Sequence, residues 1–475
     1  MIGILSYGVY IPVWRMQREM IACAEGIFSA GGERSVAGFD EDSVSMAVEA
    51  GLDCLGVIDP KEIDALYFAT ISPALAQKQS ASFIAMGLDL REDIATYDIT
   101  DSQRASTLAL KAAYDAVKSG SIKNALVVTA DRRPTAPKSM MEQLYGDGAA
   151  AILIGNGKPV ALIFDIVNLY EPVLGMWRRD YDEFPVTFDQ RIDKRKGIMT
   201  IVPETVAALL SKNKLEAMDV AKFAIGITDP GSYIELARLM KVDLLKQLVD
   251  PLVTTIGMTG TPHCLILLAS ALENAGPNDK IVCVNYSDGC DAMLINTTDE
   301  ITKVKPVRKI TDYIQSKKMV ASYGRFRDMV EAGEKKSLRK QGVPSLIQYW
   351  RDKKWGVRRY GMRCNKCGTL KYPIDVCCIK CDAKDDHTDV KISRKGKVFT
   401  YAHDMLLGPG STPADGFNFT TRTVLNMDDG FRMAVEMTDN TQQEVDINMP
   451  VELTFRLLHE KGDFPCYGWR SRPVR

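Results

Sequence analysis

Residues 363–381 have the sequence RCNKCGTLKYPIDVCCIKC. This stretch contains two Cys-x-x-Cys pairs, Cys364/Cys367 and Cys378/Cys381, with ten residues between them. Each pair supplies two thiolates from one turn, and four thiolates complete the tetrahedral shell of Zn²⁺ without leaving a position for a substrate. The stretch therefore predicts a structural zinc ion, which folds a small rubredoxin-like zinc ribbon over residues 345–392.

Two neighbouring side chains leave the ligand set open at this point. His387 follows Cys381 by six residues and offers a nitrogen ligand, and Cys377 directly precedes Cys378. The Cys-x-x-Cys spacing of residues 378–381 favours four thiolates, with Cys377 as a spectator.

The chain on either side of the predicted ribbon differs in character. After it, short stretches with alternating apolar residues are separated by Gly and Asp turns, which predicts a small OB-fold β-barrel over residues 393–475. Before it, residues 303–344 are rich in Lys, Arg and Glu with helical spacing, which indicates a charged helical linker.

Residues 1–302 alternate short apolar strands with helical stretches. The clearest predicted strands are 63–70, 124–131, 149–155, 222–228 and 280–286, and the clearest helices are 107–118, 232–240 and 263–274. Such alternation is typical of a layered α/β fold. The rhythm of residues 1–165 recurs in 166–302, which suggests an internal duplication of the fold.

Composition excludes several classes of protein. The chain has 475 residues, 46% of them hydrophobic and 25% charged, and a formal net charge of −1. There is no global basic field for nucleic acid, and no apolar run approaches the roughly 20 residues that span a bilayer. Five of the eleven cysteines lie in the predicted zinc segment, and this distribution fits a reducing cytoplasm better than a disulfide framework. We expect a cytoplasmic, multidomain protein.

The first 300 residues carry a family resemblance. Residues 145–155, YGDGAAAILIG, preceded by ALVVTAD at 125–131, resemble the thiolase superfamily, in particular its ketoacyl synthase III and HMG-CoA synthase branch. The segment NYSDGCDA at 285–292 is similar to the Gly-rich strand end of that duplicated fold, and Trp177–Arg179 with Phe184-Pro185 is similar to archaeal-type HMG-CoA synthases. The resemblance implies an acyl-CoA substrate, a homodimer, and a pantetheine tunnel that ends near Ser102, His263 and Asp288.

The last 130 residues carry a second resemblance. The Cys-x-x-Cys pairs, Tyr372-Pro373 and the late segment Tyr467–Arg470 are similar to zinc-ribbon and OB-fold proteins that accompany acyl-CoA enzymes. In that family the module associates with thiolases and HMG-CoA synthases and helps to form the passage for coenzyme A. The resemblance therefore implies a thiolase subunit as a further partner.

The catalytic residues of the superfamily are missing from the positions where they are expected. Ser102 stands where the acyl-carrying Cys belongs, or Gln103 does if the register slips by one. The expected Glu falls at Ile71, the expected His falls within residues 228–230, and the expected Asn falls at Met258. A thiolate at a helix start is nucleophilic near neutral pH, whereas a serine hydroxyl needs a dedicated base. Acyl transfer through a thioester is therefore disfavoured.

An aldol or retro-aldol step on a CoA thioester needs no thiol. It needs a base for one proton and donors for the enolate oxygen, and backbone N–H groups near Gly289 and Ser102 are candidates for those donors. We expect an acyl-CoA C–C lyase or synthase. The alternative is a catalytically degenerate subunit that stabilises an active thiolase.

Three residues are the main catalytic candidates: Ser102, His263 and Asp229. For Ser102 the competing interpretation is a helix-capping pair with Asp101. His263 lies five residues after the expected Asn, although a helix-start His bonded to the backbone would look the same. Asp229 precedes Pro-Gly-Ser, where a structural cap is the competing interpretation. Tyr233 and Asp288 are weaker candidates, and Cys290 fits a small buried hydrophobe.

Overall fold

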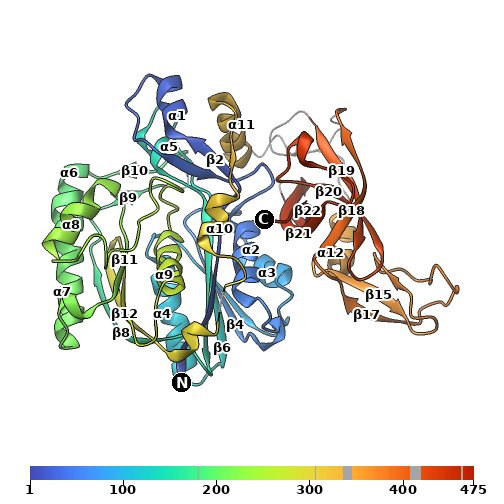
Figure 1. The fold of residues 1–475 in the computed structure, drawn as a ribbon, viewed down its shortest axis with the longest axis horizontal. Helices are drawn as coiled ribbons and strands as arrows, with labels where there is room; N and C mark the ends of the chain where they lie inside the picture. The colour runs from blue at the N-terminus through green and yellow to red at the C-terminus, as the bar shows by residue number, and fades with distance from the viewer. Residues whose placement is uncertain (180, 305, 335–344, 407–418, 462–463) are drawn as a thin grey trace.

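A computed structural model describes residues 1–475 except 180, 305, 335–344, 407–418 and 462–463. Figure 1 shows a large α/β part on one side and a smaller β-rich part on the other, with the C-terminus between them. The large part comes from the first two thirds of the chain and the small part from the last third. The described residues contain no helix long and apolar enough to cross a membrane.

The centre of the α/β part is a nine-stranded sheet of order β11-β12-β13-β8-β1-β7-β6-β4-β5. In chain order these strands are β1 (Ile2–Tyr10), β4 (Ala65–Ala69), β5 (Ala95–Ile99), β6 (Asn124–Asp131), β7 (Gly148–Asn156), β8 (Ala161–Tyr170), β11 (Lys222–Gly226), β12 (Lys280–Ser287) and β13 (Gly289–Thr297). The sheet consists of two halves, which meet through one residue pair of β1 and β8, Ile4 and Ala161. Each half has its parallel strands on the outside, so the predicted duplicated, layered thiolase-like fold is confirmed.

The remaining elements of the α/β part cover and extend this sheet. The helices are α1 (Arg18–Glu25), α2 (Ser43–Leu55), α3 (Ser80–Gly87), α4 (Ala105–Lys118), α5 (Met140–Leu144), α6 (Gln190–Ile192), α7 (Val202–Lys212), α8 (Tyr233–Leu239), α9 (His263–Glu273), α10 (Ile310–Gln315) and α11 (Tyr323–Glu334), with a π-helical stretch at Asp193–Ile201. The short strands are β2 (Trp14–Gln17), β3 (Glu33–Val36), β9 (Met176–Trp177), β10 (Val186–Thr187) and β14 (Lys318–Met319).

Small side chains in β7 let helices approach the sheet closely. Ala149, Ala150 and Ala151 are fully buried, and α2, α4 and α9 all contact this strand. The start of α2 is held by a capping box, in which the Asp42 carboxylate accepts the N–H of Ser45 and the Ser45 hydroxyl accepts the N–H of Asp42. A capping box satisfies N–H groups that the first turn of a helix leaves free.

The β-rich part contains a closed five-stranded barrel of order β18-β19-β20-β22-β21 and a three-stranded sheet of order β16-β15-β17. The elements are α12 (Leu346–Gly356), β15 (Tyr360–Cys364), β16 (Leu370–Lys371), β17 (His387–Lys391), β18 (Lys395–Asp404), β19 (Thr420–Met427), β20 (Arg432–Met437), β21 (Pro450–Lys461) and β22 (Phe464–Pro473). The predicted barrel is present, and the small sheet holds the four-cysteine cluster. The domain boundaries drawn from the sequence remain predictions, and residues 335–344 of the expected linker lie outside the described residues.

Buried ion pairs join the barrel to the α/β part. Arg456 of β21 is fully buried and reaches Glu41 at 3.1 Å, and Arg470 of β22 reaches Asp40 at 3.0 Å. Tyr467 of the same strand donates to the Asp42 carboxylate at 2.7 Å. Residues 40–42, which lead into α2, therefore form part of the surface that the barrel contacts.

Candidate functional site

A cavity of about 540 Å³ lies at the carboxyl ends of the parallel strands β4, β5 and β6, where α4 begins. The end of β5 and the loops that follow the three strands supply residues 71–73, 75–78, 98, 100–103 and 133–134 of its lining. The turn between β12 and β13 supplies Ser287 and Asp288. Ligands of α/β proteins commonly bind at this end of parallel strands, so the cavity is the candidate site.

Ser102 and Asp288 meet in this cavity. The Ser102 hydroxyl donates to the Asp288 carboxylate at 2.5 Å and accepts the backbone N–H of Arg104 at 3.2 Å. The residue before the serine, Asp101, has a left-handed backbone with φ of 79°, which makes a sharp turn between β5 and α4. A serine hydroxyl bonded to a carboxylate is a pair that can hold and move a proton.

Arg104 fixes the loop that carries Asp288. Its guanidinium forms two bonds with the buried Asp291 carboxylate, at 3.1 and 2.5 Å, and donates to the backbone carbonyl of Asp288 at 2.7 Å. Gly289 makes this approach possible, because a Cβ there would lie 2.1 Å from the carbonyl oxygen of Leu169 and 2.8 Å from Arg104. The position of Asp288 is therefore set by the residue that directly precedes α4.

Two backbone N–H groups in the turn before α4 are without an acceptor among the described residues. The N–H groups of Ser102 and Gln103 make no hydrogen bond to any residue in the described part of the chain. Both residues line the cavity and lie in the turn that leads into the 14-residue helix α4, whose N-terminus carries partial positive charge. Such N–H groups can stabilise a developing oxyanion.

The other predicted site residues lie elsewhere. His263 begins α9, is only 4% exposed, and does not line the cavity. Its Nδ1 accepts the Thr259 N–H at 3.5 Å, while burial and the charge of Arg133 lower the pKa of the imidazole to about 4. Asp229 caps a short 3₁₀ turn through the N–H of Gly231 and also lies outside the cavity lining. Both remain predictions as catalytic groups.

The positions of the expected Glu and Asn carry Ile71 and Met258, which have no acid–base group. Ile71, at the position of the expected Glu, lines the cavity, whereas Met258 does not. Tyr233 is buried and donates to the carbonyl of Ile225 at 3.0 Å, and Cys290 is fully buried. Burial raises the pKa of the Cys290 thiol to about 12. No cysteine is among the described residues that line the cavity.

Apart from Gln103, sequence analysis missed the group of residues that contacts Met176 in the cavity. Its sulfur accepts from Gln103 Nε2 at 3.3 Å and from Arg133 Nη2 at 3.1 Å. The Arg133 guanidinium lies 3.4 Å from the centre of the Tyr145 ring. The sequence contains a signal for this arginine only as the pair Arg132-Arg133 directly after a buried strand, and nothing local distinguishes the two.

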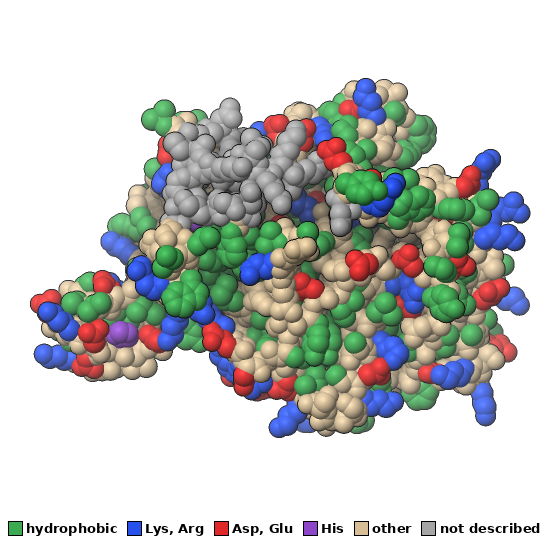
Figure 2. All heavy atoms as spheres, turned by 180° about the vertical axis from the view of Figure 1, so that it is seen from behind, with side chains coloured by type: hydrophobic (Ala, Val, Ile, Leu, Met, Phe, Trp, Pro, Cys, Tyr) green, Lys and Arg blue, Asp and Glu red, His purple; other side chains and the backbone are tan. Residues whose placement is uncertain are grey.

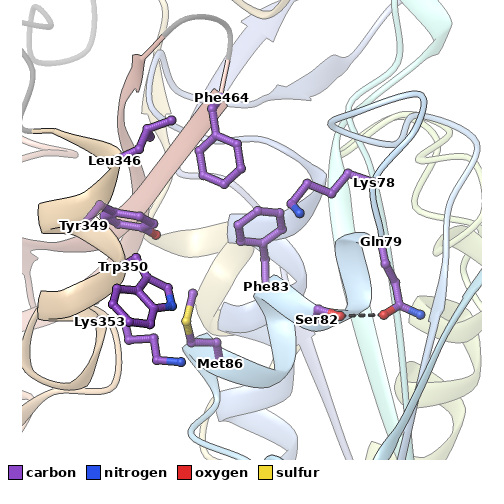
Figure 3. Close-up of a pocket in the computed structure, with 10 residues that line it drawn as sticks. All are labelled: Lys78, Gln79, Ser82, Phe83, Met86, Leu346, Tyr349, Trp350, Lys353 and Phe464. Atoms are coloured by element: carbon purple, nitrogen blue, oxygen red, sulfur yellow. Dashed lines mark hydrogen bonds between the residues drawn. The ribbon is translucent and has the colours of Figure 1, made fainter.

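A second hollow of about 440 Å³ lies between α3, α12 and the start of β22. Figure 3 shows Phe83 of α3 facing Phe464, Tyr349 and Trp350 across it, and the amine of Lys78 lying near the two phenylalanine rings. The ten lining residues are Lys78, Gln79, Ser82, Phe83, Met86, Leu346, Tyr349, Trp350, Lys353 and Phe464. They include two cations and no carboxylate. Lys78 also lines the cavity at Ser102, so the two hollows adjoin.

The four cysteines of the zinc prediction come together in the small sheet. All four sulfurs lie within 4.8 Å of one another, with Cys364–Cys381 at 3.6 Å and Cys367–Cys378 at 3.5 Å. Four sulfurs at Zn–S distances of 2.3 Å and tetrahedral angles are separated by about 3.8 Å, so the cluster fits Zn²⁺. His387 and Cys377 are not part of the cluster.

Known proteins resemble the part of the chain that contains the Ser102 cavity. A family model of 3-oxoacyl-[acyl-carrier-protein] synthase III matches residues 97–167, which run from β5 through Ser102 into β8. The hydroxymethylglutaryl-CoA synthase of Methanosphaera stadtmanae is 30% identical over 348 residues, which are 70% of this chain and 99% of that protein. The chain belongs to the hydroxymethylglutaryl-CoA synthase family. The enzyme of Archaeoglobus fulgidus is 29% identical over 70% of this chain and 100% of its own length.

Solved structures show that the fold of this family is shared. MvaS in complex with 3-hydroxy-3-methylglutaryl coenzyme A superimposes with a TM-score of 0.60 at 19% identity, covering 70% of this chain and 91% of that one. An HMG-CoA synthase complexed with CoA gives 0.58 at 18% identity, covering 72% and 92%. The two synthases aligned by sequence each cover 70% of this chain. Nearly a third of the chain therefore lies outside these alignments.

Proposed function

We propose that the protein makes or breaks a C–C bond in a CoA thioester, in an aldol or retro-aldol step, without a covalent thiol intermediate. The observation that carries the proposal is the hydrogen bond between Ser102 and Asp288 in a cavity whose described lining contains no cysteine. Family membership supports an acyl-CoA substrate. We infer that acyl transfer through a covalent intermediate is disfavoured, because Ser102 stands at the position expected for the thiol and a serine hydroxyl is a far weaker nucleophile than a thiolate.

The residues of the cavity have distinct roles in such a step. In the retro-aldol direction the Asp288 carboxylate takes the proton of the β-hydroxyl, the Cα–Cβ bond breaks, and its electron pair forms the enolate of the shorter thioester. The N–H groups of Ser102 and Gln103 bind the enolate oxygen, and Ser102 passes the proton back to Cα. A positioned acid–base pair contributes about 10²–10⁴-fold, and each oxyanion donor contributes about 10²–10³-fold.

The adjoining hollow offers a place for the distal end of coenzyme A. Its aromatic side chains suit an adenine ring, and Lys78 and Lys353 are the charged residues among the described residues that line it. Lys78 stands where this hollow meets the Ser102 cavity. We propose that the nucleotide lies against Trp350 and Phe83, with the pantetheine passing Lys78 toward Ser102.

We propose further that two copies of the chain associate along β5. This strand forms the edge of the nine-stranded sheet and carries Tyr97, which is 45% exposed. An edge strand with free N–H and C=O groups is a ready pairing surface. The zinc ion would be structural, because four thiolates leave no position for a substrate.

The second candidate function is that of a degenerate subunit which stabilises an active thiolase. The observation in its favour is that no described cavity residue is a cysteine or a histidine. Figure 2 shows acidic, basic and hydrophobic side chains interspersed on one face, which suits a protein partner better than nucleic acid.

Turnover by the purified chain decides between these functions. The protein would be incubated with 3-hydroxy-3-methylglutaryl-CoA, and formation of acetyl-CoA and acetoacetate followed by chromatography and mass spectrometry; acetyl-CoA with acetoacetate tests the reverse direction. Asp288→Asn should lower the rate by at least about 100-fold, whereas Asp115→Asn, an exposed control on α4, should leave it unchanged. His263→Asn and Asp229→Asn test the two remaining candidates. A chain without turnover that co-purifies with a thiolase would support the structural role instead.

A further inference from the structure

Met176 in β9 is the meeting point of three hydrogen-bond donors. Its sulfur lies 3.3 Å from Gln103 Nε2, 3.1 Å from Arg133 Nη2 and 3.6 Å from the Tyr145 hydroxyl. The donors come from the turn before α4, from the loop after β6 and from the residue that follows α5. A thioether sulfur is a weak acceptor, so it satisfies these groups poorly.

The three donors have no stronger acceptor in the described part of the chain. Arg133 is only 5% exposed, its Nη1 is buried without a hydrogen-bond partner, and no ion pair among the described residues includes it. Tyr145 is fully buried, and among those residues its hydroxyl bonds only to the Met176 sulfur. The side-chain nitrogen of Gln103 has the same single partner there. Buried polar groups are normally well paired, so this cluster is short of an acceptor.

The sulfur is also within reach of small molecules that enter the cavity. Met176 lines the cavity of about 540 Å³ that holds Ser102, and the residue is only partly buried. Oxidation converts the apolar thioether of methionine into a polar sulfoxide. The sulfoxide oxygen is one bond from the sulfur, so the same three donors can reach it.

We propose that Met176 is a site of oxidation by hydrogen peroxide, and that the three donors around it promote the reaction and hold the sulfoxide. A sulfur lone pair attacks one peroxide oxygen, and the O–O bond breaks. The second oxygen leaves as hydroxide, which takes the proton of the transferred hydroxyl group and becomes water. Sulfur loses two electrons and the peroxide gains them. Donors beside the sulfur stabilise the negative charge that develops on the leaving oxygen.

The sulfoxide would regulate the cavity at Ser102. Gln103, one of the donors that would hold it, directly follows Ser102, so the added oxygen lies beside the turn where the thioester is expected. An oxygen bonded to the Arg133 guanidinium is not easily displaced, because charge-assisted hydrogen bonds are the stronger ones. Oxidation should therefore lower turnover. This consequence rests on the proposed function, whereas the oxidation of Met176 does not.

Rates of oxidation test the site without any substrate. The intact protein would be treated with hydrogen peroxide in the presence of zinc, and the sulfoxides quantified over time by peptide mass spectrometry. Met86 is the internal control, because it is partly buried and lines the adjoining hollow, but its sulfur has no donor among the described residues. Met176 should be oxidised at least about tenfold faster than Met86, since one net hydrogen bond to the leaving oxygen changes a rate by about that factor.

Substitution of the donors tests their part in the reaction. Gln103→Leu and Arg133→Leu should each lower the Met176 rate toward that of Met86. Tyr145→Phe loses only a hydroxyl and should have a smaller effect in the same direction, which keeps the test open if a larger change prevents folding. Arg179→Leu removes an exposed arginine outside the cavity lining and should leave the Met176 rate unchanged. Equal rates for Met176 and Met86, or a Met176 rate that no folded donor variant changes, would overturn the proposal.

Turnover tests the regulatory consequence. Peroxide-treated wild type should lose activity in proportion to the sulfoxide at Met176, and the loss should persist after dithiothreitol, which reduces disulfides and sulfenic acids but not a sulfoxide. Met176→Leu, compared with its own untreated rate, should resist the same treatment. An equal loss of activity in Met176→Leu and in the wild type would overturn the regulatory role. Absence of turnover in the untreated wild type would overturn the proposed function alone, because the sulfoxide at Met176 is measured without substrate.

Discussion

Glu49 of α2 lies 2.9 Å from the guanidinium of Arg472 in β22, and their side chains are only 3% and 2% exposed. The same carboxylate accepts the backbone N–H of Phe455 in β21 at 2.9 Å. Burial by itself raises the pKa of Glu49, but Arg472 and Arg394 outweigh it and lower the pKa to about 2. One acidic side chain of the α/β part therefore holds two strands of the barrel.

Glu49→Gln should destabilise the protein by about 3–5 kcal/mol, because it leaves Arg472 buried with one partner fewer. Urea unfolding followed by circular dichroism at pH 7 measures the change. The control is Asp115→Asn, which breaks an exposed pair with Lys111 on α4 and should cost less than about 1 kcal/mol. Equal effects of the two variants would contradict the role given to Glu49.

The contribution of the Glu49–Arg472 ion pair to stability should be lost in acid. The folded-state pKa of Glu49 is below its ordinary value, so its contribution to stability is present above about pH 4.5 and is lost as the pH falls toward 2. Between pH 5 and 3 the wild type should lose more stability than Glu49→Gln. A wild type and variant with parallel pH profiles would show that the carboxylate is not ionised in the folded state.

Zinc should be bound by four thiolates and not by Cys377. The purified chain should contain one zinc ion, measured by mass spectrometry or by a colorimetric chelator after thiol modification. Cys378→Ser should lose the metal and unfold the small sheet, since such modules depend on metal for folding. Cys377→Ser is the matched control, because the Cys377 sulfur is next to Cys378 in the sequence but lies outside the cluster. This variant should retain the metal. Loss of zinc from the control would mean that the register of ligands is shifted.

Alkylation should leave turnover intact. Iodoacetamide reacts with thiolates, and burial raises the pKa of Cys290 to about 12, while a hydrogen bond with Cys283 and burial raise that of Cys264. With zinc bound, Cys23 is the exposed thiol and should react first. Peptide mapping and residual activity would be measured together. Rapid inactivation that maps to Cys264 or Cys290 would show that a thiol takes part in the chemistry.

His263 should make the fold sensitive to mild acid. Its folded-state pKa of about 4 is below the ordinary 6.5, so the unfolded chain takes up the proton first, and stability falls as the pH drops from 6.5 to 4. The loss from this residue amounts to roughly 3 kcal/mol over that range. Urea unfolding midpoints of the wild type and of His263→Asn would be measured at pH 7.5, 5.5 and 4.5. The difference between the two midpoints should become smaller as the pH falls. His403→Asn, on the barrel, is the control, and a His263→Asn profile that stays parallel to the wild type would contradict the prediction.

Local patterns were enough for much of the architecture. The apolar run Asn124–Asp131 predicts β6 to the residue, and His263–Glu273 agrees with the predicted helix within one residue, because both segments are long, strongly apolar and closed by turn residues. The four cysteines were recognisable because a metal knuckle depends on spacing within a few residues. The β-barrel followed from short alternating strands separated by turns.

The site itself depends on contacts that no local pattern contains. Ser102 and Asp288 are 186 residues apart, and Glu49 and Arg472 are 423 apart, so each pair exists only through the way the strands are ordered and the barrel is seated. Asp288 was a weak candidate for that reason. Arg133 was missed because its contacts with Met176 and Tyr145 join segments that are distant in the chain. The amino-acid sequence determined which segments become strands, helices and a metal knuckle, since these depend on nearby residues; the tertiary structure alone decided which polar groups share a cavity, because burial and charge pairing are set by segments distant in the chain.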